Sequence, residues 1–315
     1  MSTKTAVVTG GAGFVGSHIS DALKNEDWTV IVLDNLSSGK ESNLSDKIEL
    51  EIFDITKDNV ETIFRKIKPD KIFHTAAQIS VNKSTKNPFY DAKQNIIGTI
   101  KVLDAIRIIG KGIEPFVFLS TGGAIYGNTD KFPVNENTYP NPESPYAISK
   151  FSAENYVQYY RRNYSLNTSI IRPANIYGPR QDPNGEAGVV AIFIKAMLLE
   201  KKVNIFGKGD NIRDYIHVKD IVKGCILASE LSYKGPINLG TGKGTTVLEL
   251  FNYLSKNCNY NSSPNFIKER PSDVKSITLD CSLAQKVLNW SPNIDLEEGL
   301  KNTIKWFENY SENFN

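Results

Sequence analysis

Two side chains that could carry acid–base chemistry, Tyr146 and Lys150, lie four residues apart. Residues at this spacing share one face of a helix, and Ser144-Pro145 just before them is a good helix start, with serine at the cap and proline at the first position. A free tyrosine has a pKa of about 10, and a nearby ammonium lowers it by stabilising the phenolate. The spacing indicates a tyrosine base assisted by a lysine, although an ordinary exposed helix can carry the same pair.

A glycine-rich turn, Thr9-Gly10-Gly11-Ala12-Gly13-Phe14-Val15-Gly16, follows a short apolar run and opens a helical pattern. Glycines allow the backbone to approach a pyrophosphate closely, and free N–H groups at a helix start bind its phosphates. The next strand ends at Asp34, 21 residues beyond Gly13, where a carboxylate accepts hydrogen bonds from a ribose and repels a 2′-phosphate. The two features together predict a site for NAD in preference to NADP.

Two further strand ends carry polar or small residues. Asp54 ends the third strand, where it is either an acceptor for the adenine amino group or a helix cap, and the sequence leaves both open. His74-Thr75-Ala76-Ala77-Gln78 ends the fourth, and its small residues permit backbone contact with the middle of the cofactor. We expect His74 to be a packed residue rather than a catalytic base.

The segments that must position these residues alternate between apolar runs typical of strands and patterns with helical spacing. Short, nearly continuous apolar runs predict strands at residues 6–8, 30–33, 50–53, 71–73, 116–119 and 169–171, covered on both faces. Helical patterns lie between them, at 60–67 with Asp58 near its N-cap and at 90–109 ended by Gly110. This alternation predicts an α/β fold with a doubly wound parallel sheet of the Rossmann type over residues 1–171.

The second half is less regular. Residues 172–188 contain three prolines and three glycines and are expected to form a loop, whereas 189–199 and 220–229 are expected to be helices. We place a smaller C-terminal substrate domain at 172–315, with a return of the chain to the first sheet near 214–240.

Composition excludes several classes of function. Lys and Arg number 37 against 35 Asp and Glu, which gives a net charge of +2 and no electrostatic reason to expect nucleic acid or an anionic membrane as partner. The sequence has neither a run of about 18 apolar residues nor a signal-peptide pattern. Three scattered cysteines and three scattered histidines suggest neither disulfides nor a metal site. We therefore expect a cytoplasmic protein without a metal.

Six segments together carry a resemblance to the extended short-chain dehydrogenase/reductase family, and within it to the nucleotide-sugar epimerases and dehydratases, most of all the UDP-galactose (UDP-glucose) 4-epimerases. The segments are Thr9 to Gly16, Asn95-Ile96-Ile97-Gly98-Thr99, Ser120-Thr121-Gly122-Gly123-Ala124-Ile125-Tyr126-Gly127, Tyr146 to Lys150, Arg172-Pro173-Ala174-Asn175-Ile176-Tyr177-Gly178-Pro179-Arg180 and Arg213-Asp214-Tyr215-Ile216-His217-Val218-Lys219-Asp220.

The residues after Thr121 separate the members of this family. Its dehydratases carry an Asp-Glu pair there and its decarboxylases a Ser-Glu pair, whereas this chain has Gly122-Gly123. Without a second acid, the resemblance implies epimerisation by reversible hydride exchange. Many 4-epimerases have a hydroxyl at the position of Gly122 that bonds the sugar 4-oxygen, and we assign that role here to Thr121.

The resemblance also implies the mechanism. Tyr146 takes the 4-OH proton while C4 gives a hydride to NAD, and Lys150 lowers the tyrosine pKa and contacts the nicotinamide ribose. The 4-keto sugar then turns over and receives both back on the opposite face, so the enzyme is an isomerase. Proton and hydride transfer need groups held within about 3–3.5 Å, which makes anchoring of the nucleotide important.

The remaining site residues are also implied by the resemblance. Arg213 and Arg270 would bind the UDP phosphates, Asn175 the diphosphate, Asp273 the ribose, and Asn204 and Phe206 the uracil. Further substrate contacts are Ser80, Thr121, Gly122 and Val189. The contacts to NAD are Gly10, Gly13, Phe14, Val15, Gly16, Asp34, Asn35, Ser38, Gly39, Asp54, Ile55, Thr75, Ala76, Ala77, Gln78, Asn95, Ser120, Tyr146, Lys150 and Pro173.

Sugar identity, enzyme class and assembly stay open at this level. Ile277 stands where a bulky aromatic would exclude an N-acetyl group, so UDP-N-acetylhexosamines are possible second substrates. The alternatives are another enzyme of the family, such as a UDP-glucuronate 4-epimerase or a dehydratase, and a non-catalytic NAD-binding regulator. The apolar 90–109 helix either pairs with a second copy to form a homodimer, as is common in the family, or is buried within the monomer.

Overall fold

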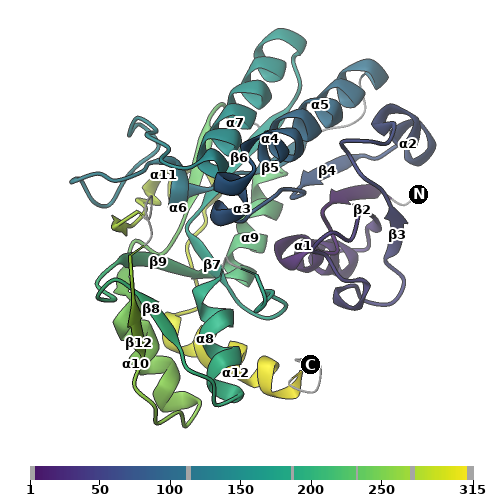
Figure 1. Ribbon diagram of the computed structural model, residues 1–315. Helices are drawn as coiled ribbons and strands as arrows, with labels where there is room; N and C mark the ends of the chain where they lie inside the picture. Colours follow the sequence, from purple (N-terminus) through teal and green to yellow (C-terminus); the bar gives the residue numbers. More distant parts are fainter. Residues whose placement is uncertain (1–3, 111–114, 186–187, 232, 270–273, 311–315) are drawn as a thin grey trace. The chain divides into compact units, whose positions relative to one another are not determined.

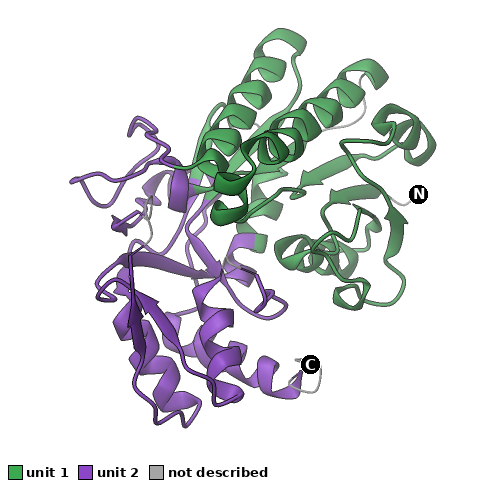
Figure 2. Cartoon of the chain, viewed as in Figure 1, with its two compact units in different colours: residues 1–121, 144–172, 222–237 green, residues 122–143, 173–221, 238–315 purple. Residues whose placement is uncertain are grey.

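The computed structural model describes residues 4–110, 115–185, 188–231, 233–269 and 274–310 (Figure 1). The chain forms two compact units that are interleaved along the sequence (Figure 2). The first unit consists of residues 1–121, 144–172 and 222–237, and the second of residues 122–143, 173–221 and 238–315. Both units therefore take up segments from the two halves of the chain.

A seven-stranded sheet is the frame of the first unit, and it confirms the predicted α/β fold with a doubly wound parallel sheet. Its order is β10-β6-β5-β4-β1-β2-β3. The strands are β1 (Thr5–Thr9), β2 (Thr29–Asp34), β3 (Glu49–Ile52), β4 (Lys71–His74), β5 (Phe116–Leu119), β6 (Thr168–Pro173) and β10 (Pro236–Leu239). All six predicted strands are present, and β10 adds a seventh at the edge beside β6.

The strand order reverses at β1. The chain first moves outward through β2 and β3, and then crosses to β4 on the other side of β1, where Val8 lies opposite Phe73 and Thr9 opposite His74. In parallel sheets of this kind, ligands bind outside the carboxyl ends of the strands at such a switch point. The segments that leave β1 and β4 there are the glycine-rich turn and residues 75–78.

Helices cover the sheet because its strands are apolar on both faces. Those of the first unit are α1 (Phe14–Asn25), α2 (Val60–Ile67), α3 (Val81–Lys86), α4 (Pro88–Ala92), α5 (Gly98–Ile109) and α7 (Pro145–Tyr164), with a short 3₁₀ turn η1 (Glu41–Asn43) and a π-helical segment η2 (Lys93–Ile97). Helix α9 (Val218–Ala228) runs from the second unit into the first. One core joins Phe64 of α2, Leu103 of α5 and Val157 of α7 to Val7 and Phe118 of the sheet.

Two predicted helices differ in detail from the expectation. Asn59, not Asp58, caps α2 by accepting a hydrogen bond from Thr62 N at 3.0 Å, because Asp58 is occupied with the backbone N–H of Asp54. The helix expected at 90–109 begins earlier, at Pro88, and η2 interrupts it before α5 continues to the predicted end at Gly110. A pattern search that assumes 3.6 residues per turn does not detect the extra residue of a π-helical turn.

The second unit is built on two small sheets. One has the order β11-β9-β13, with β7 also paired to β9, and the other joins β12 to β8. The strands are β7 (Asn175–Tyr177), β8 (Asn204–Phe206), β9 (Ile212–His217), β11 (Gly244–Thr246), β12 (Asn265–Ile267) and β13 (Ser276–Ile277). The helices are α6 (Gly122–Ile125), α8 (Val189–Leu198), α10 (Val247–Asn257), α11 (Ser282–Leu288) and α12 (Leu296–Asn309). Their core contains Phe193, Phe251 and Phe307.

Some expectations for the second half need correction. Residues 172–188 are not loop throughout, because the end of β6 and the short strand β7 lie within them. Helix α8 agrees with the predicted 189–199 to within one residue, and α9 starts two residues before the predicted 220.

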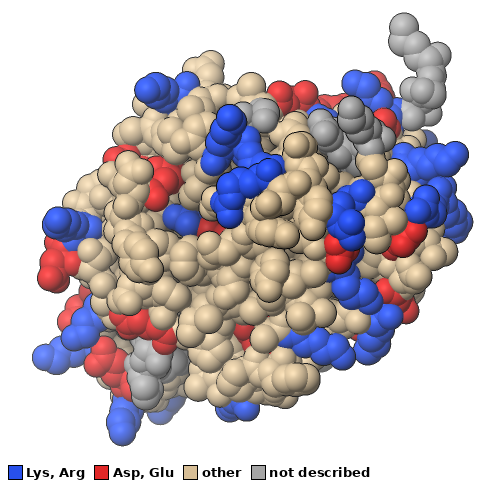
Figure 3. Space-filling view, turned by 90° about the horizontal axis from the view of Figure 1, so that it is seen from above, with Lys and Arg blue, Asp and Glu red and all other residues tan. Residues whose placement is uncertain are grey.

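Surface and composition features agree with a chain of balanced charge. On the face seen in Figure 3, Lys and Arg are interspersed with Asp and Glu and do not gather into one large patch. Within the described ranges, no helix is long and apolar enough to cross a membrane, and no group of three His, Cys, Asp or Glu side chains could hold a metal ion. Cys225, Cys258 and Cys281 are all free thiols.

Candidate active site

The tyrosine–lysine pair lies in the first two turns of α7, which begins as the sequence predicts. Ser144 is the N-cap and accepts a hydrogen bond from Ala147 N at 3.2 Å, and Pro145 occupies the first helical position. The backbone N–H of Tyr146, unpaired within the helix, donates to Ser84 Oγ at 3.1 Å. These two hydrogen bonds hold the backbone of the first turn of α7, from which the Tyr146 side chain projects.

The Tyr146 phenol is hydrogen-bonded to the Thr121 side chain, so the two residues assigned to the sugar hydroxyl come together. Desolvation raises the pKa of Tyr146 to about 12, while the Thr121 hydrogen bond acts in the opposite direction and the negative charge of Asp91 adds to the rise. This direction differs from that expected from the Tyr–Lys spacing. In the protein alone the phenol is held protonated at neutral pH, and it needs additional positive charge to become a base.

Lys150, four residues after Tyr146 in α7, is almost fully buried. Its Nζ donates to Leu119 O at 2.6 Å and lies 4.3 Å from the centre of the Phe118 ring. Burial lowers its pKa to about 8, against the charges of Glu154 and Asp91, which favour the ammonium. Lys150 is therefore mainly an ammonium at neutral pH.

The glycine-rich turn is shaped by close backbone packing. A Cβ on Gly16 would lie 2.3 Å from Gly10 O, and Gly10 itself has a φ of +70°. Gly13, the N-cap residue of α1, offers no capping side chain, and the first turn of α1 contains no acidic residue. The N–H groups at this helix start are therefore free of side-chain caps, which suits a bound anion such as a pyrophosphate.

Asp34 lies beside this turn at the end of β2. Its Oδ2 accepts from Ala12 N at 3.0 Å and its Oδ1 from Leu36 N at 2.8 Å. Burial raises the pKa of Asp34, and the two backbone hydrogen bonds lower it. Each carboxylate oxygen accepts one such bond and has a second lone pair, so the oxygens can also accept from the two hydroxyls of a ribose.

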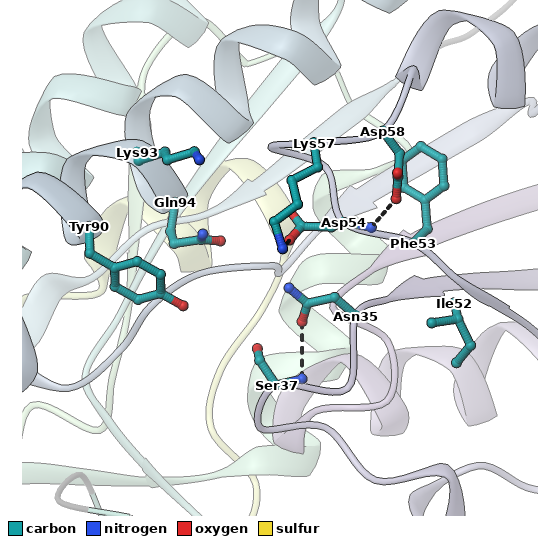
Figure 4. A pocket seen from close by; sticks show the side chains of 10 residues that line it. All are labelled: Asn35, Ser37, Ile52, Phe53, Asp54, Lys57, Asp58, Tyr90, Lys93 and Gln94. Atoms are coloured by element: carbon teal, nitrogen blue, oxygen red, sulfur yellow. Dashed lines mark hydrogen bonds and ion pairs between the residues drawn. The ribbon is translucent and has the colours of Figure 1, made fainter.

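A pocket of about 470 Å³ continues from this edge of the sheet (Figure 4). Asn35 and Asp54 line one side of it, and Tyr90, Lys93 and Gln94 line the other. Asp54 accepts from the Thr56 backbone and hydroxyl and pairs with Lys57 Nζ at 3.2 Å. Burial works against the charge of Asp54, but these hydrogen bonds, with one to Asn35, lower its pKa to about 2. Asp54 is thus a fixed anion facing a pocket whose volume falls within the range of about 300–1,000 Å³ that is common for small-molecule sites.

The residues after β4 divide into a packed group and a pocket-facing group. His74 is buried between Thr9 Oγ1 at 2.6 Å and Thr99 Oγ1 at 3.0 Å and stacks on Phe116 and Phe118. Its burial lowers its pKa to about 3, and the charge of Lys150 contributes. His74 is therefore the packed residue that we expected. Thr75 Oγ1 donates to Thr9 O at 2.8 Å, which ties β4 to the glycine turn.

The other residues assigned to the cofactor lie in the first unit, except Pro173, which belongs to the second. Phe14 and Val15 open α1, Asn35, Ser38 and Gly39 follow β2, Ile55 is buried next to Asp54, Ala76, Ala77 and Gln78 follow β4, Asn95 is buried in η2, Ser120 follows β5, and Pro173 ends β6, where the second unit begins. Ser120 Oγ is buried without a hydrogen-bond partner among the described residues. Ser80, assigned to the substrate, also caps α3 by accepting from Lys83 N at 3.0 Å.

Apart from Ser80 and Thr121, which belong to the first unit, the described residues expected to bind the nucleotide sugar lie in the second unit. Gly122 opens α6, and Asn175 begins β7 close to Gly123, whose Cβ would lie 3.1 Å from Asn175 Oδ1. Arg213 lies in β9 and donates to Ile212 O and Lys275 O. Asn204 and Phe206 lie in β8, Val189 begins α8, and Ile277 is buried in β13. Arg270 and Asp273 lie outside the described residues.

Sequence reasoning did not identify three residues that lie near the turn of α7 carrying Tyr146 and Lys150. Ser84 receives the Tyr146 N–H, and Ser149 and Asp91 lie close to the same helix turn. Ser149 stands between Tyr146 and Lys150, and Asp91 precedes Asn95 by four residues. That helical spacing was the available signal, but nothing in it distinguishes a buried carboxylate from an exposed one.

The fold and this group of residues define a dinucleotide-binding enzyme of the short-chain dehydrogenase/reductase class. The model of the NAD dependent epimerase/dehydratase family matches residues 6–240, so the chain belongs to this family.

Individual relatives agree in length and fold. A putative UDP-glucose 4-epimerase of Methanocaldococcus jannaschii is 42% identical over 96% of this chain and 98% of its own. The crystal structure of a UDP-glucose 4-epimerase from Thermotoga maritima with UDP-glucose covers 98% of this chain and 99% of its own at a TM-score of 0.95 and 45% identity. The UDP-N-acetylglucosamine 4-epimerase of Methanobrevibacter ruminantium, in complex with UDP-N-acetylmuramic acid, covers 98% of this chain and 100% of its own at a TM-score of 0.91 and 36% identity.

Proposed function

We propose that this protein is an NAD-dependent isomerase that inverts C4 of a UDP-hexose, with UDP-glucose and UDP-galactose as the main pair. One observation carries the proposal: the Tyr146 phenol is hydrogen-bonded to Thr121, and the two residues that follow Thr121 are glycines instead of acids. A single acid–base group suffices for exchange of a hydride at one carbon, whereas elimination of water needs a second group. The printed activities of the relatives at 42% and 45% identity support the same reaction.

The glycine turn, Asp34 and the pocket around Asp54 would hold the pyrophosphate, ribose and adenine parts of NAD. When bound, NAD supplies the acceptor and donor of the hydride at sugar C4, and its cationic ring adds positive charge near the phenol. The donor set fits, because the start of α1 presents uncapped N–H groups and Asp34 presents two oxygens with free lone pairs.

The proton is handled by residues of the chain itself. Tyr146, once ionised, accepts the proton of the sugar 4-hydroxyl and later returns it to the 4-keto sugar. The Thr121 hydroxyl lowers the pKa of the phenol through its hydrogen bond. When the sugar is bound, the same hydroxyl can hydrogen-bond to the sugar 4-oxygen. Lys150, whose buried Nζ donates to Leu119 O, supplies an ammonium on the same helix four residues after Tyr146. General acid–base catalysis of this kind contributes roughly 10²–10⁴-fold to a rate.

The nucleotide end of the substrate is assigned to the C-terminal part of the chain. We propose that residues 172–315 carry the UDP-binding groups, with Arg213, Arg270 and Asn175 at the diphosphate, Asp273 at the ribose, and Asn204 and Phe206 at the uracil. The buried Asn175 Oδ1 without a hydrogen-bond partner among the described residues supports a ligand contact for that amide. Ser80, Gly122 and Val189 complete the assignment.

Activity on N-acetylated sugars is a second part of the proposal. Ile277 is smaller than an aromatic side chain, and the 36% identical relative is named for UDP-N-acetylglucosamine. The test is incubation of the purified protein with UDP-galactose, UDP-N-acetylglucosamine and UDP-glucuronate, with the products separated by chromatography. Conversion of UDP-galactose to UDP-glucose is expected. A product from UDP-glucuronate alone would replace the proposal with the glucuronate epimerase, and no turnover of UDP-N-acetylglucosamine would remove its second part.

Assembly and location are also proposals. Several large apolar side chains are exposed on the helices of the first unit, including Phe89 at 80%, Ile148 at 50% and Ile97 at 48%. Because α4 and α5 both pack against α7, we propose that these helices pair with a second copy to form a homodimer. Light scattering should give twice the 35.1 kDa mass of the chain, and Phe89→Asp should shift the protein to the monomer. The three free thiols support a cytoplasmic location.

A further inference from the structure

A fully buried carboxylate, that of Asp91, lies beside the proposed active site and has no part in the mechanism given above. Asp91 belongs to α4 and is 0% exposed. Its Oδ1 accepts from Gln78 Nε2 at 2.6 Å and from Asn95 Nδ2 at 3.2 Å. Its Oδ2 is buried and accepts no hydrogen bond from any residue that the structure describes. Burial of a charge costs free energy unless the charge is paired, so an anion in this position calls for an explanation.

Asn95 connects this carboxylate to Gln78, in the segment after β4 that we assign to NAD. Its Oδ1 accepts from Gln78 N at 2.8 Å, and its Nδ2 donates to Gln78 O at 3.0 Å. Asn95 lies in the π-helical segment η2, and single π-helical turns within α-helices are frequent at functional sites. Asp91 and Asn95 thereby hold both the backbone and the side chain of Gln78, the last of the small group of residues after β4.

The side-chain amide of Asn95 also contacts α7, the helix that carries Tyr146 and Lys150. Asn95 Nδ2 lies 3.0 Å from Ser149 Oγ, and Ser149 Oγ donates to Tyr146 O at 3.0 Å. Ser149 is flanked by the acid–base tyrosine and by Lys150 in the first two turns of α7. A chain of hydrogen bonds therefore runs from the buried carboxylate through Asn95 and Ser149 to the backbone of Tyr146.

The charge of Asp91 acts on both members of the pair. It raises the pKa of Tyr146 and the pKa of Lys150. The other charged group that favours the Lys150 ammonium is Glu154 on α7, which is itself paired with Arg172. His74, on β4, is held neutral and contributes no charge at neutral pH.

We propose that Asp91 is a positioning residue: its carboxylate holds Gln78, Asn95 and, through Ser149, the first turn of α7 in one arrangement, and it supplies the negative charge that balances the buried Lys150 ammonium. This inference rests on the proposed function, because it assumes that Tyr146 is the acid–base group. Without the negative charge of Asp91, Tyr146 and Lys150 would both lose their protons at lower pH. The pH range in which the enzyme is active would therefore move, in addition to any change in the maximal rate.

The test compares the pH dependence of kcat for the wild-type enzyme, Asp91→Asn and Asp27→Asn with UDP-galactose. Asp91→Asn keeps the shape of the side chain and removes its charge. We expect both limbs of the bell-shaped profile to shift to lower pH by about half a unit or more, because the charge of Asp91 raises the pKa of both Tyr146 and Lys150. Asp27→Asn removes an equal charge at an exposed residue with a φ of 62°, which asparagine also tolerates, and should leave the profile in place.

A lower rate for Asp91→Asn with both limbs unmoved would assign Asp91 a structural role only and overturn the inference, as would an unchanged profile. Ser149→Ala provides a second arm if Asp91→Asn does not fold. It breaks the link to α7 but retains the charge, so kcat should fall several-fold without a shift of the limbs, and a wild-type kcat would contradict the positioning role. Absence of turnover in the wild-type enzyme would instead count against the proposed function.

Discussion

Arg172 and Glu154 form a fully buried ion pair that joins strand β6 to helix α7. Arg172 Nη2 lies 2.6 Å from Glu154 Oε2, and Nε lies 3.0 Å from Oε1, so the pair is bidentate. Both side chains are 3% exposed or less. Glu154 is one turn beyond Lys150 and favours its ammonium form. The pair thus ties helix α7 to strand β6, and its glutamate is one of the two carboxylates that favour the Lys150 ammonium.

Removal of one partner should be costly. Glu154→Gln leaves the Arg172 guanidinium buried without a counter-charge, and we expect a loss of about 3–5 kcal/mol in the free energy of unfolding. Denaturant unfolding measures the loss. The matched control is Glu61→Gln, which breaks an exposed pair with Arg65 and should cost less than about 1 kcal/mol. Equal effects of the two substitutions would contradict the role given to burial.

Tyr146→Phe removes the acid–base hydroxyl and retains the ring. The expected result is a fall in kcat of roughly 10²–10⁴-fold with NAD still bound. Activity with UDP-galactose and the NAD content of the purified protein are the two measurements. Tyr156→Phe, at an exposed tyrosine of the same helix, should keep full activity. Substantial activity of Tyr146→Phe would show that another residue transfers the proton.

Asp34→Asn should change the cofactor preference. The substitution removes the charge that favours a ribose with two free hydroxyls, and its amide donor would face the N–H of Ala12 or Leu36. Loss of hydrogen bonds to a charged group corresponds to about 1.5–3 kcal/mol, so the affinity of the apo-protein for NAD should fall by roughly 10–100-fold while that for NADP falls less or rises. Titration calorimetry with both cofactors checks this. An equal loss for both would exclude Asp34 as the selective contact.

His74 should make the protein sensitive to acid. Burial lowers its pKa from 6.5 to about 3 in the folded protein. Between these values the unfolded chain binds a proton that the folded protein does not bind. The free energy of unfolding therefore falls as the pH falls from about 6.5 towards 3, by up to about 1.4 kcal/mol per pH unit from this group.

Denaturant unfolding of the wild-type protein and His74→Asn between pH 7 and pH 4 tests this linkage. The difference in stability between the two proteins should be constant above about pH 6.5 and should shrink below it. Parallel curves for wild type and His74→Asn would show that His74 takes up its proton in the folded state as easily as in the unfolded one.

Much of the first unit could be predicted from the sequence because its signals are local. A buried parallel strand is a short apolar run, and a dinucleotide turn is a set of glycines at fixed spacing before a helix. The N-cap Ser144 and the proline after it mark the start of α7 to the residue. These features depend on neighbours a few positions away, so the alternation of strands and helices, and the fold class, follow from the chain alone.

Only the tertiary structure decided how these elements meet and what environment they create. The return of residues 222–237 to the first unit and the addition of β10 depend on contacts over long sequence separations. No periodicity reveals that Asp91 is buried, that Lys150 points to Leu119 O, or that Ser84 receives the N–H of Tyr146. The residue types near the active site were thus present in the sequence, but desolvation, which sets the pKa values of Tyr146 and Lys150, arises only when distant segments exclude water from them.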